Sequence, residues 1–135
     1  MKKLFLILLM AISTHIAYSQ TTDYLLSSHI LDISTGKPAP DVPVKLELKN
    51  VTTGKWAYVD QKITDKNGRI TNFLEKSTAK KGIYRLTFLT EKYFSLKATE
   101  TFYPFIEVVF QIGEESHYHV PITLSPFGYS TYRGN

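Results

Sequence analysis

The sequence predicts an all-β fold, a two-sheet antiparallel β-sandwich with one short helix. From residue 20 onward it consists of short runs rich in β-branched and aromatic residues. Apolar and polar residues alternate within these runs, and turn residues recur about every eight to twelve positions, which is typical of sandwich proteins. Only residues 91–98 depart from this pattern and predict a helix, with Thr90 as its N-cap and Glu91 in its first turn.

The first two predicted strands flank a turn. Residues 29–33 predict the first strand, and residues 34–40, which contain one glycine and two prolines, predict the turn that ends it. Residues 42–49 alternate valine or leucine with proline, lysine or glutamate. This alternation predicts a strand with one face buried and the other face in water.

The later strands are separated by further turn signals. Residues 56–64 and 69–73 predict strands joined at Asn67 and Gly68, a pair that supplies the positive φ of a tight hairpin turn. The same alternation continues to the end of the chain. It predicts four more strands, at residues 83–90, 105–112, 117–124 and 129–133.

The N-terminus has the pattern of a secretory signal peptide. Lys2 and Lys3 precede nine apolar residues, and a short polar stretch then closes on small residues, which predicts cleavage before Gln20. Nine helical residues extend about 14 Å, well short of the ~30 Å core of a bilayer. The sequence therefore predicts a signal peptide at residues 1–19 and one domain at residues 20–135, with no membrane anchor after cleavage.

The composition of the chain restricts the cellular compartments and the binding partners that we expect for the protein. The chain has no cysteine, which excludes disulfides and a lipid-anchored first mature residue. A two-lysine signal on so short a chain is typical of bacteria and predicts a secreted, periplasmic protein, with release outside the cell as the alternative. Removing Lys2 and Lys3 lowers the formal charge from +4 to +2. Because the remaining lysines are scattered among acids, we expect no nucleic-acid partner.

Three histidines remain after the signal peptide, at positions 29, 117 and 119. His117 and His119 are two apart in a predicted strand, so both rings project from the same face. Polar surface residues are one interpretation of the three. A three-histidine zinc site that includes His29 is a second. The third is metal-free acid–base chemistry, because imidazole titrates near neutrality and can activate water.

Arg69 and the C-terminal residues 132–135 are further candidates. Arg69 follows the Asn67-Gly68 turn, where its guanidinium either lies in solvent or holds carbonyl oxygens of a planar, anionic substrate. Such a group can also stabilise the oxyanion that forms when an amide is attacked. The last four residues bring together an aromatic ring, a guanidinium and the terminal carboxylate, although the end of a small domain is ordinarily frayed.

Three segments resemble one known family, the transthyretin-like 5-hydroxyisourate hydrolases. Residues 28–32 with 35–39 are similar to its first signature, and residues 64–69 to its Asp-Gly-Arg turn. Residues 117–121, running into 124–134, are similar to its second signature almost throughout. The resemblance spans residues 20–135 and is most specific at the C-terminal end.

The resemblance implies a prealbumin-like sandwich that forms a homotetramer, with active sites in a channel at the interface between dimers. It also implies hydrolysis of 5-hydroxyisourate to 2-oxo-4-hydroxy-4-carboxy-5-ureidoimidazoline, a step of urate degradation towards allantoin. The small-molecule substrate would be the only ligand, because the reaction requires neither a cofactor nor a metal.

The family's functional positions can be placed in this sequence. By motif position, the resemblance implies His29, Arg69 and His119 as catalytic residues. His29 and Arg69 would also contact the substrate, together with Tyr132 and Arg133. His119 or His29 would activate the attacking water, Arg69 would orient the substrate, and Tyr132 would help to seat its ring.

Two further positions are candidates for the same site, His117 and Asn135. His117 matches a family position in the second signature. Asn135 stands where the family usually ends in serine. If the terminal hydroxyl took part in proton transfer, an amide in its place would only hydrogen-bond, because it does not titrate usefully. In that case we expect lower activity than in a relative that ends in serine. If the tail instead acts through its backbone and its carboxylate, the change to asparagine should affect activity little.

Two non-enzymatic alternatives share parts of this sequence pattern. Residues 35–42 and 64–69 also resemble the carboxypeptidase-regulatory-like sandwich domains of exported proteins, which generally lack the His-Tyr-His and Tyr-Arg-Gly elements. Transthyretin-type carriers of small hydrophobic ligands use the same channel. These carriers have smaller or apolar residues in place of the histidines, the arginine and the last four residues. This sequence keeps the histidines, the arginine and the C-terminal residues.

Overall fold

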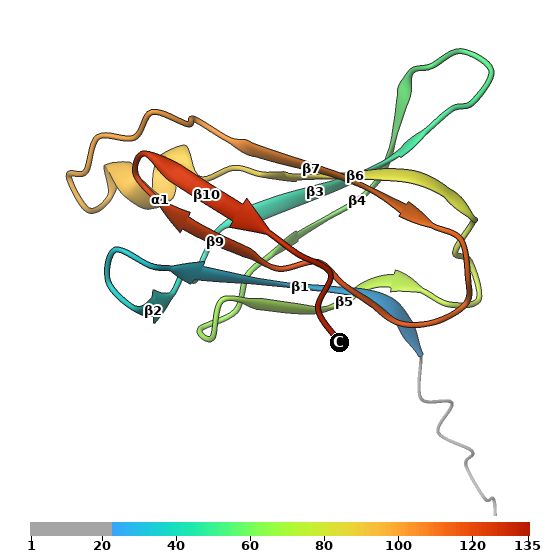
Figure 1. Cartoon of the computed structure of the whole chain (residues 1–135), viewed down its shortest axis with the longest axis horizontal. Coiled ribbons are helices and arrows are strands. Elements are labelled where there is room, and N and C mark those ends of the chain that lie inside the picture. The colour runs from blue at the N-terminus through green and yellow to red at the C-terminus, as the bar shows by residue number, and fades with distance from the viewer. Residues whose placement is uncertain (1–22) are drawn as a thin grey trace, which may run out of the picture.

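The computed structural model describes residues 23–135, and it confirms the predicted β-sandwich. The predicted signal peptide, residues 1–19, lies outside the described residues. Two sheets pack face to face, one ordered β10-β9-β1-β2 and the other β4-β3-β6-β7 (Figure 1). The strands are β1 (Tyr24–Asp32), β2 (Lys37–Pro38), β3 (Pro43–Lys49), β4 (Trp56–Ile63), β5 (Arg69–Glu75), β6 (Gly82–Phe88), β7 (Ile106–Ile112), β8 (Tyr118–His119), β9 (Ile122–Ser125) and β10 (Gly128–Thr131).

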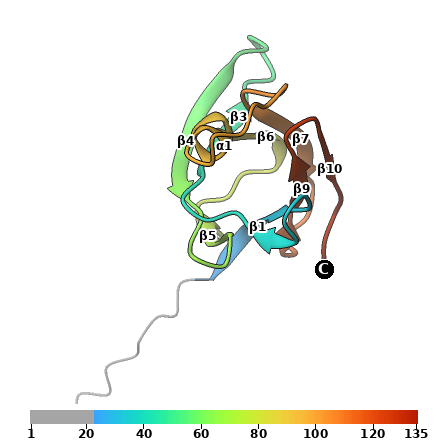
Figure 2. The same cartoon turned by 90° about the vertical axis from the view of Figure 1, so that its left-hand side faces the viewer.

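The core lies between the sheets, where alternate residues of each strand point inward. In β3 the predicted apolar face is buried, with Val44 and Leu46 fully enclosed. Leu26 and Ile30 of β1 are equally buried in the facing sheet. The helix α1 (Glu91–Ser95) buries two aromatic side chains and lies across one end of the sandwich (Figure 2).

The strand β1 is the centre of the first sheet. It pairs antiparallel with β5 along one side and parallel with β8 and β9 along the other. Segments from both ends of the chain therefore meet on β1. This arrangement brings the candidate residues of β5 and β8 to the same strand.

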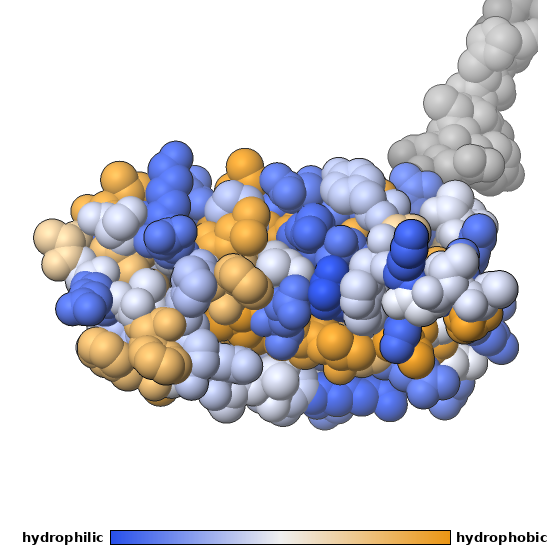
Figure 3. All heavy atoms as spheres, turned by 90° about the horizontal axis from the view of Figure 1, so that it is seen from above, coloured by the Kyte–Doolittle hydropathy of each residue, from blue (hydrophilic) through white to orange (hydrophobic). Residues whose placement is uncertain are grey.

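The outer face of the second sheet carries a polar network centred on Arg85. Arg85 donates to Glu47 at 2.7 Å, pairs with Glu107 at 3.1 Å and lies over the ring of Trp56. Burial opposes the ionisation of Glu47, but hydrogen bonds from Arg85 and Lys45 outweigh it and hold the pKa of Glu47 below its ordinary value. Viewed from this side, hydrophilic and hydrophobic residues are interspersed across the face (Figure 3).

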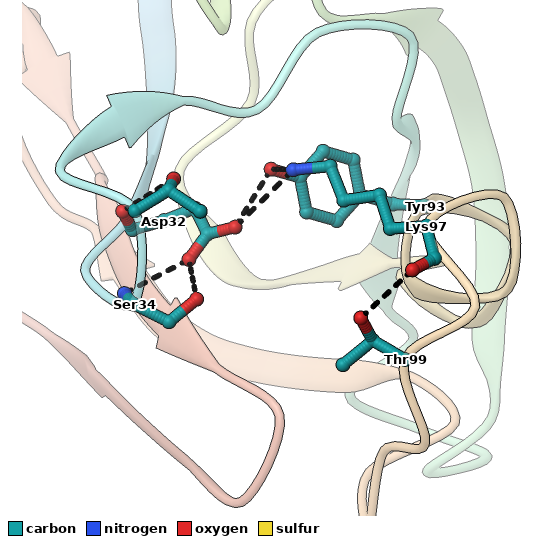
Figure 4. Close-up of polar contacts among 6 residues, drawn as sticks. Asp32, Ser34, Tyr93, Lys97 and Thr99 are labelled. Atoms are coloured by element: carbon teal, nitrogen blue, oxygen red, sulfur yellow. Dashed lines mark hydrogen bonds and ion pairs between the residues drawn. The ribbon is translucent and has the colours of Figure 1, made fainter.

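A buried polar cluster joins the end of β1 to α1 (Figure 4). Asp32 is 1% exposed and accepts hydrogen bonds from the hydroxyl of Tyr93 at 2.8 Å and from the amide of Ser34 at 2.9 Å. Lys97 donates to the same carboxylate at 3.4 Å and also bonds Tyr93. Burial opposes the charge of Asp32, but hydrogen bonds from Ser34 and Tyr93 hold its pKa below the ordinary value.

The turn at Asn67 and Gly68 is not the predicted hairpin, because β4 and β5 belong to different sheets. Gly68 has a positive φ of 68°, whereas Asn67 does not adopt one. The carboxylate of Asp65 accepts the amides of Asn67 at 2.8 Å and Arg69 at 2.9 Å. These bonds stabilise a turn with glycine in its last position, so the chain crosses from one sheet to the other.

The predicted helix at 91–98 is too long, whereas Thr90 does occupy the predicted N-cap position, but without a capping hydrogen bond from its side chain. Helix α1 ends at Ser95, and the chain reaches a positive φ at Ala98. The backbone of Thr90 is already helical, and its hydroxyl points to the carbonyl of Tyr103 at 3.5 Å. A capping side chain usually requires an extended backbone at the N-cap, which explains why the hydroxyl of Thr90 makes no capping hydrogen bond.

Several predicted strand boundaries also differ, and three of these differences lie in the strands around the candidate site. β1 begins at Tyr24, five residues before the predicted start, because apolar residues continue towards the N-terminus. The predicted strand at 117–124 is divided into β8 and β9 around Pro121, which has no amide to extend the ladder. β10 ends at Thr131, so the predicted site residues Tyr132 and Arg133 lie just beyond the sheet.

Candidate functional site

His29 and Arg69 face each other across β1 and β5, whose register pairs these two residues. Gly68 makes this approach feasible, because a Cβ there would lie 2.7 Å from the carbonyl oxygen of Ile30. The amide of Ile30 in turn donates to the carbonyl of Gly68 at 2.9 Å. The turn glycine thus fixes where β5 starts and places Arg69 beside His29.

His119 reaches the same strand from the other side, where the parallel register pairs it with Ser27. The hydroxyl of Ser27 lies 2.8 Å from Nδ1 of His119 and 2.8 Å from Nε2 of His117. Ser27 and His29 are two apart in a strand, so they project from one face. The structure therefore brings three histidines and Arg69 together around β1 and confirms that His117 and His119 share a face.

The environment of His29 and His119 lowers the pKa of both rings, which favours their neutral forms. Burial lowers the pKa of His119 below the ordinary value, and the charge of Arg69 acts in the same direction. Burial and Arg69 also lower the pKa of His29, although the backbone of Asn67 and the carboxylate of Asp65 oppose them. A neutral imidazole has a free lone pair, so these rings can accept a proton near neutral pH.

The C-terminal tail is paired with this cluster rather than frayed. The amide of Gly134 donates to the carbonyl of His119 at 2.9 Å, which forms an isolated β-bridge. The guanidinium carbon of Arg133 lies 4.9 Å from the centre of the Tyr118 ring. Tyr132 is 60% exposed and, with Arg133, lines a cleft of about 370 Å³ against β7. Asn135 is also exposed.

Replacing Gly134 with alanine is expected to displace the tail from His119, because the new Cβ would lie 2.4 Å from Cδ2 of that rigid ring. The bridge would be lost at a cost of about 1 kcal/mol, the usual contribution of one such hydrogen bond. Histidine ¹³C–¹H spectra should show a shifted His119 ring. Gly113→Ala is the matched control, since a Cβ at Gly113 meets nothing within 4 Å. An unshifted ring in Gly134→Ala would contradict this prediction.

The described residues offer no support for the zinc interpretation. Among residues 23–135, no group of three or more histidine, cysteine or acidic side chains is arranged to hold a metal ion. His117 and His119 instead direct ring nitrogens at the same hydroxyl. Within the same residues, no helix is long and apolar enough to cross a membrane.

Ser27 is the site residue that the sequence analysis missed. Its position two residues before His29 on a strand was a usable signal, because both side chains must share a face. What the sequence did not show is the parallel pairing of β8 with β1, which brings Ser27 against residues 90 and 92 positions away.

Comparison with known proteins identifies the family. The family model described as HIUase/Transthyretin family matches residues 26–134, nearly all of the described chain. The chain belongs to this family. The match includes every candidate site residue except the terminal Asn135.

Among relatives with known names are enzymes from bacteria and animals. The chain is 47% identical to 5-hydroxyisourate hydrolase of Salmonella typhimurium over 82% of its own length and 81% of the relative's. It is 39% identical to 5-hydroxyisourate hydrolase of Mus musculus, over 82% of its own length and 94% of the relative's.

Solved structures similar to this chain include a 5-hydroxyisourate hydrolase and a transthyretin. The 5-hydroxyisourate hydrolase of Klebsiella pneumoniae superposes with a TM-score of 0.69 at 36% identity, covering 82% of this chain and 98% of that one. Sea bream transthyretin, solved in complex with thyroxine, superposes with a TM-score of 0.77 at 33% identity, covering 82% of this chain and 94% of that one. Backbone shape therefore does not separate the two activities, and the site residues must decide between them.

Proposed function

We propose that the protein hydrolyses 5-hydroxyisourate to 2-oxo-4-hydroxy-4-carboxy-5-ureidoimidazoline. The observation that carries this proposal is the cluster of His29, Arg69 and His119 around β1, in which the guanidinium also lowers the pKa of both imidazoles. Relatives named 5-hydroxyisourate hydrolase, up to 47% identical in sequence, support it. A protein that only binds a hydrophobic ligand does not require two imidazoles and a guanidinium in its binding site.

The reaction needs a base and an anion-stabilising group, and the cluster supplies both. His119 or His29 accepts a proton from water as the water oxygen bonds to the carbonyl carbon of the ring amide. Arg69 holds the carbonyl oxygen as negative charge develops on it. The carbon–nitrogen bond then breaks, and the proton passes to the leaving nitrogen, so that one water is added across the amide.

The tail residues complete the proposed site. Tyr132 and Arg133 are proposed to contact the substrate, although in a single chain they line the cleft against β7 rather than the histidine cluster. Asn135 ends the tail that pairs with His119 through Gly134, so its carboxylate and amide are available to the same site.

The direct test generates 5-hydroxyisourate in place with urate oxidase and follows its ultraviolet absorbance. Purified protein should accelerate the decay well above the spontaneous rate, and a chelator should leave the acceleration unchanged. Decay at the spontaneous rate would refute the proposed function. Loss of activity with the chelator, restored by zinc, would instead favour a metal-dependent reaction.

The pH dependence of the reaction follows from the histidine environment. Because burial and Arg69 lower the pKa of His119, its neutral form persists below the ordinary value of 6.5. The acid limb of a kcat/KM profile is therefore expected to have its midpoint below pH 6.5, and activity should fall as pH drops through it. A midpoint above 6.5 would contradict the assignment of a desolvated histidine as the base.

We also propose that the protein is a homotetramer in which neighbouring subunits close the site. In one chain the site is open, with Arg69 and Tyr132 exposed. β7 and β10 each lie at one edge of their sheet. The side chain of Val109 in β7 is 57% exposed. Free strand edges flanked by apolar side chains favour pairing with another chain. Light scattering after size-exclusion chromatography tests this, and a monomer at micromolar concentration would refute it.

We further propose that the protein is exported and matures at Gln20. The proposal depends on the pattern of residues 1–19, since a basic start, an apolar stretch and small residues are typical of a signal peptide. Mass spectrometry of protein recovered from a bacterial periplasmic fraction should find Gln20 at the N-terminus. Recovery of the uncleaved chain from the cytoplasmic fraction alone would refute it.

A further inference from the structure

The hydroxyl of Ser27 is shared between two imidazole rings. It lies 2.8 Å from Nε2 of His117 and 2.8 Å from Nδ1 of His119. A hydroxyl has one proton, so Ser27 donates to one ring and accepts from the other. The direction of this pair of bonds decides which nitrogen of His119 carries its proton.

A backbone carbonyl fixes the direction. Nδ1 of His117 lies 3.1 Å from the carbonyl oxygen of Tyr24, which only accepts, so Nδ1 carries the proton of a neutral His117. Nε2 of His117 is then unprotonated and accepts the proton of Ser27. The hydroxyl oxygen of Ser27 therefore accepts a hydrogen bond from His119. This requires that Nδ1 of a neutral His119 is protonated and that its Nε2 is unprotonated.

We propose that Ser27 and His117 are positioning residues that hold His119 in its Nδ1-protonated tautomer, which makes Nε2 of His119 the base that takes the proton from water. This inference rests on the proposed function and deepens it, because it chooses His119 over His29. Within the described residues, no side-chain hydroxyl bonds the ring of His29, in contrast to the rings of His117 and His119.

The residues around His119 are consistent with its role as the general base. His119 is half-buried and His117 is exposed, so the chain of bonds runs from the site to the solvent-facing end of β1. The groups that face His119 are Arg69 from β5, His29 from β1 and the neighbouring His117, all of which disfavour a second proton on its ring. Orientation of a histidine base through its Nδ1–H by a neighbouring acceptor is a general device of hydrolytic sites.

The tautomer can be measured without substrate. Long-range ¹H–¹⁵N spectra of histidine-labelled protein near pH 7.5 should show Nδ1 of His119 protonated and Nε2 unprotonated. In Ser27→Ala the hydroxyl acceptor is lost, and His119 should shift towards the Nε2-protonated form. A wild-type His119 protonated on Nε2 would overturn the inference.

Steady-state kinetics of Ser27 variants provide a second test of the inference. Ser27→Ala is expected to lower kcat by about 10²-fold, the scale of general-base catalysis, while KM changes little. Ser27→Thr retains a hydroxyl and should restore both the tautomer and most of kcat. Ser28→Ala is the matched control, since the neighbouring hydroxyl donates to the carbonyl of Val120 at 2.8 Å and touches no histidine. It should lower the Tm yet leave the His119 tautomer unchanged.

The outcomes separate the two claims. An active wild type whose His119 is protonated on Nε2, or a Ser27→Ala variant with wild-type kcat, overturns the inference and leaves the proposed function standing. An inactive wild type whose His119 is protonated on Nδ1 overturns the proposed function while the tautomer assignment holds.

Discussion

Arg69→Ala is expected to lower kcat/KM for 5-hydroxyisourate by about 10²- to 10³-fold, the loss seen when one oxyanion-stabilising donor is removed. The guanidinium lies opposite His29 in the β1–β5 register and lowers the pKa of both His29 and His119. Its removal should therefore also move the acid limb of the pH profile upward. Stopped-flow assays across a pH series measure both effects.

Arg69→Lys is the matched control for charge. Lysine keeps a positive charge near the histidines but lacks the planar pair of donors that an arginine offers to a carbonyl oxygen. The acid limb should stay near its wild-type position while kcat/KM remains well below wild type. Wild-type kinetics in Arg69→Ala, with the protein folded, would show that the guanidinium is an ordinary surface group.

Asp32→Ala is expected to destabilise the fold by about 1 to 3 kcal/mol, the cost of leaving a buried hydrogen-bond donor without its acceptor. The variant leaves the hydroxyl of Tyr93, the ammonium of Lys97 and the amide of Ser34 without their shared acceptor. Because the cluster joins β1 to α1, the loss should appear in global unfolding. Urea denaturation followed by fluorescence of Trp56 and by circular dichroism measures it.

Two further variants sharpen the test of the Asp32 cluster. Asp23→Ala removes an exposed carboxylate 3.5 Å from Lys76, and such a surface pair should cost less than about 1 kcal/mol. Asp32→Asn keeps the shape but removes the charge. Since the folded pKa of Asp32 is depressed, its stabilisation is present above the unfolded pKa and is lost as pH falls through the folded one. The difference between wild type and Asp32→Asn should therefore shrink in acid, and a constant difference would contradict the ionic role.

Local pattern predicted much of the fold because burial follows the period of a strand. The alternation of residues 42–49 correctly placed Val44 and Leu46 in the core. The same period predicted that His117 and His119 share a face, and both reach Ser27. These features depend only on neighbours in sequence, which explains why the sequence was sufficient.

Features that depend on distant partners were not predictable in the same way. Asn67 and Gly68 have the composition of a hairpin, yet the chain crosses between sheets because β5 finds its partner in β1. Thr90 has the residue type of a cap, but its hydroxyl is directed at Tyr103. The meeting of Ser27 with β8 requires a parallel pairing that no local signal encodes.

The pairing of Gly134 with His119 has a practical consequence for handling the protein. Because Gly134 is paired with His119, a purification tag fused after Asn135 would begin beside the proposed base. Such a fusion risks blocking substrate entry and subunit assembly together. An affinity tag is better placed ahead of β1, which begins at Tyr24, in place of the predicted signal peptide.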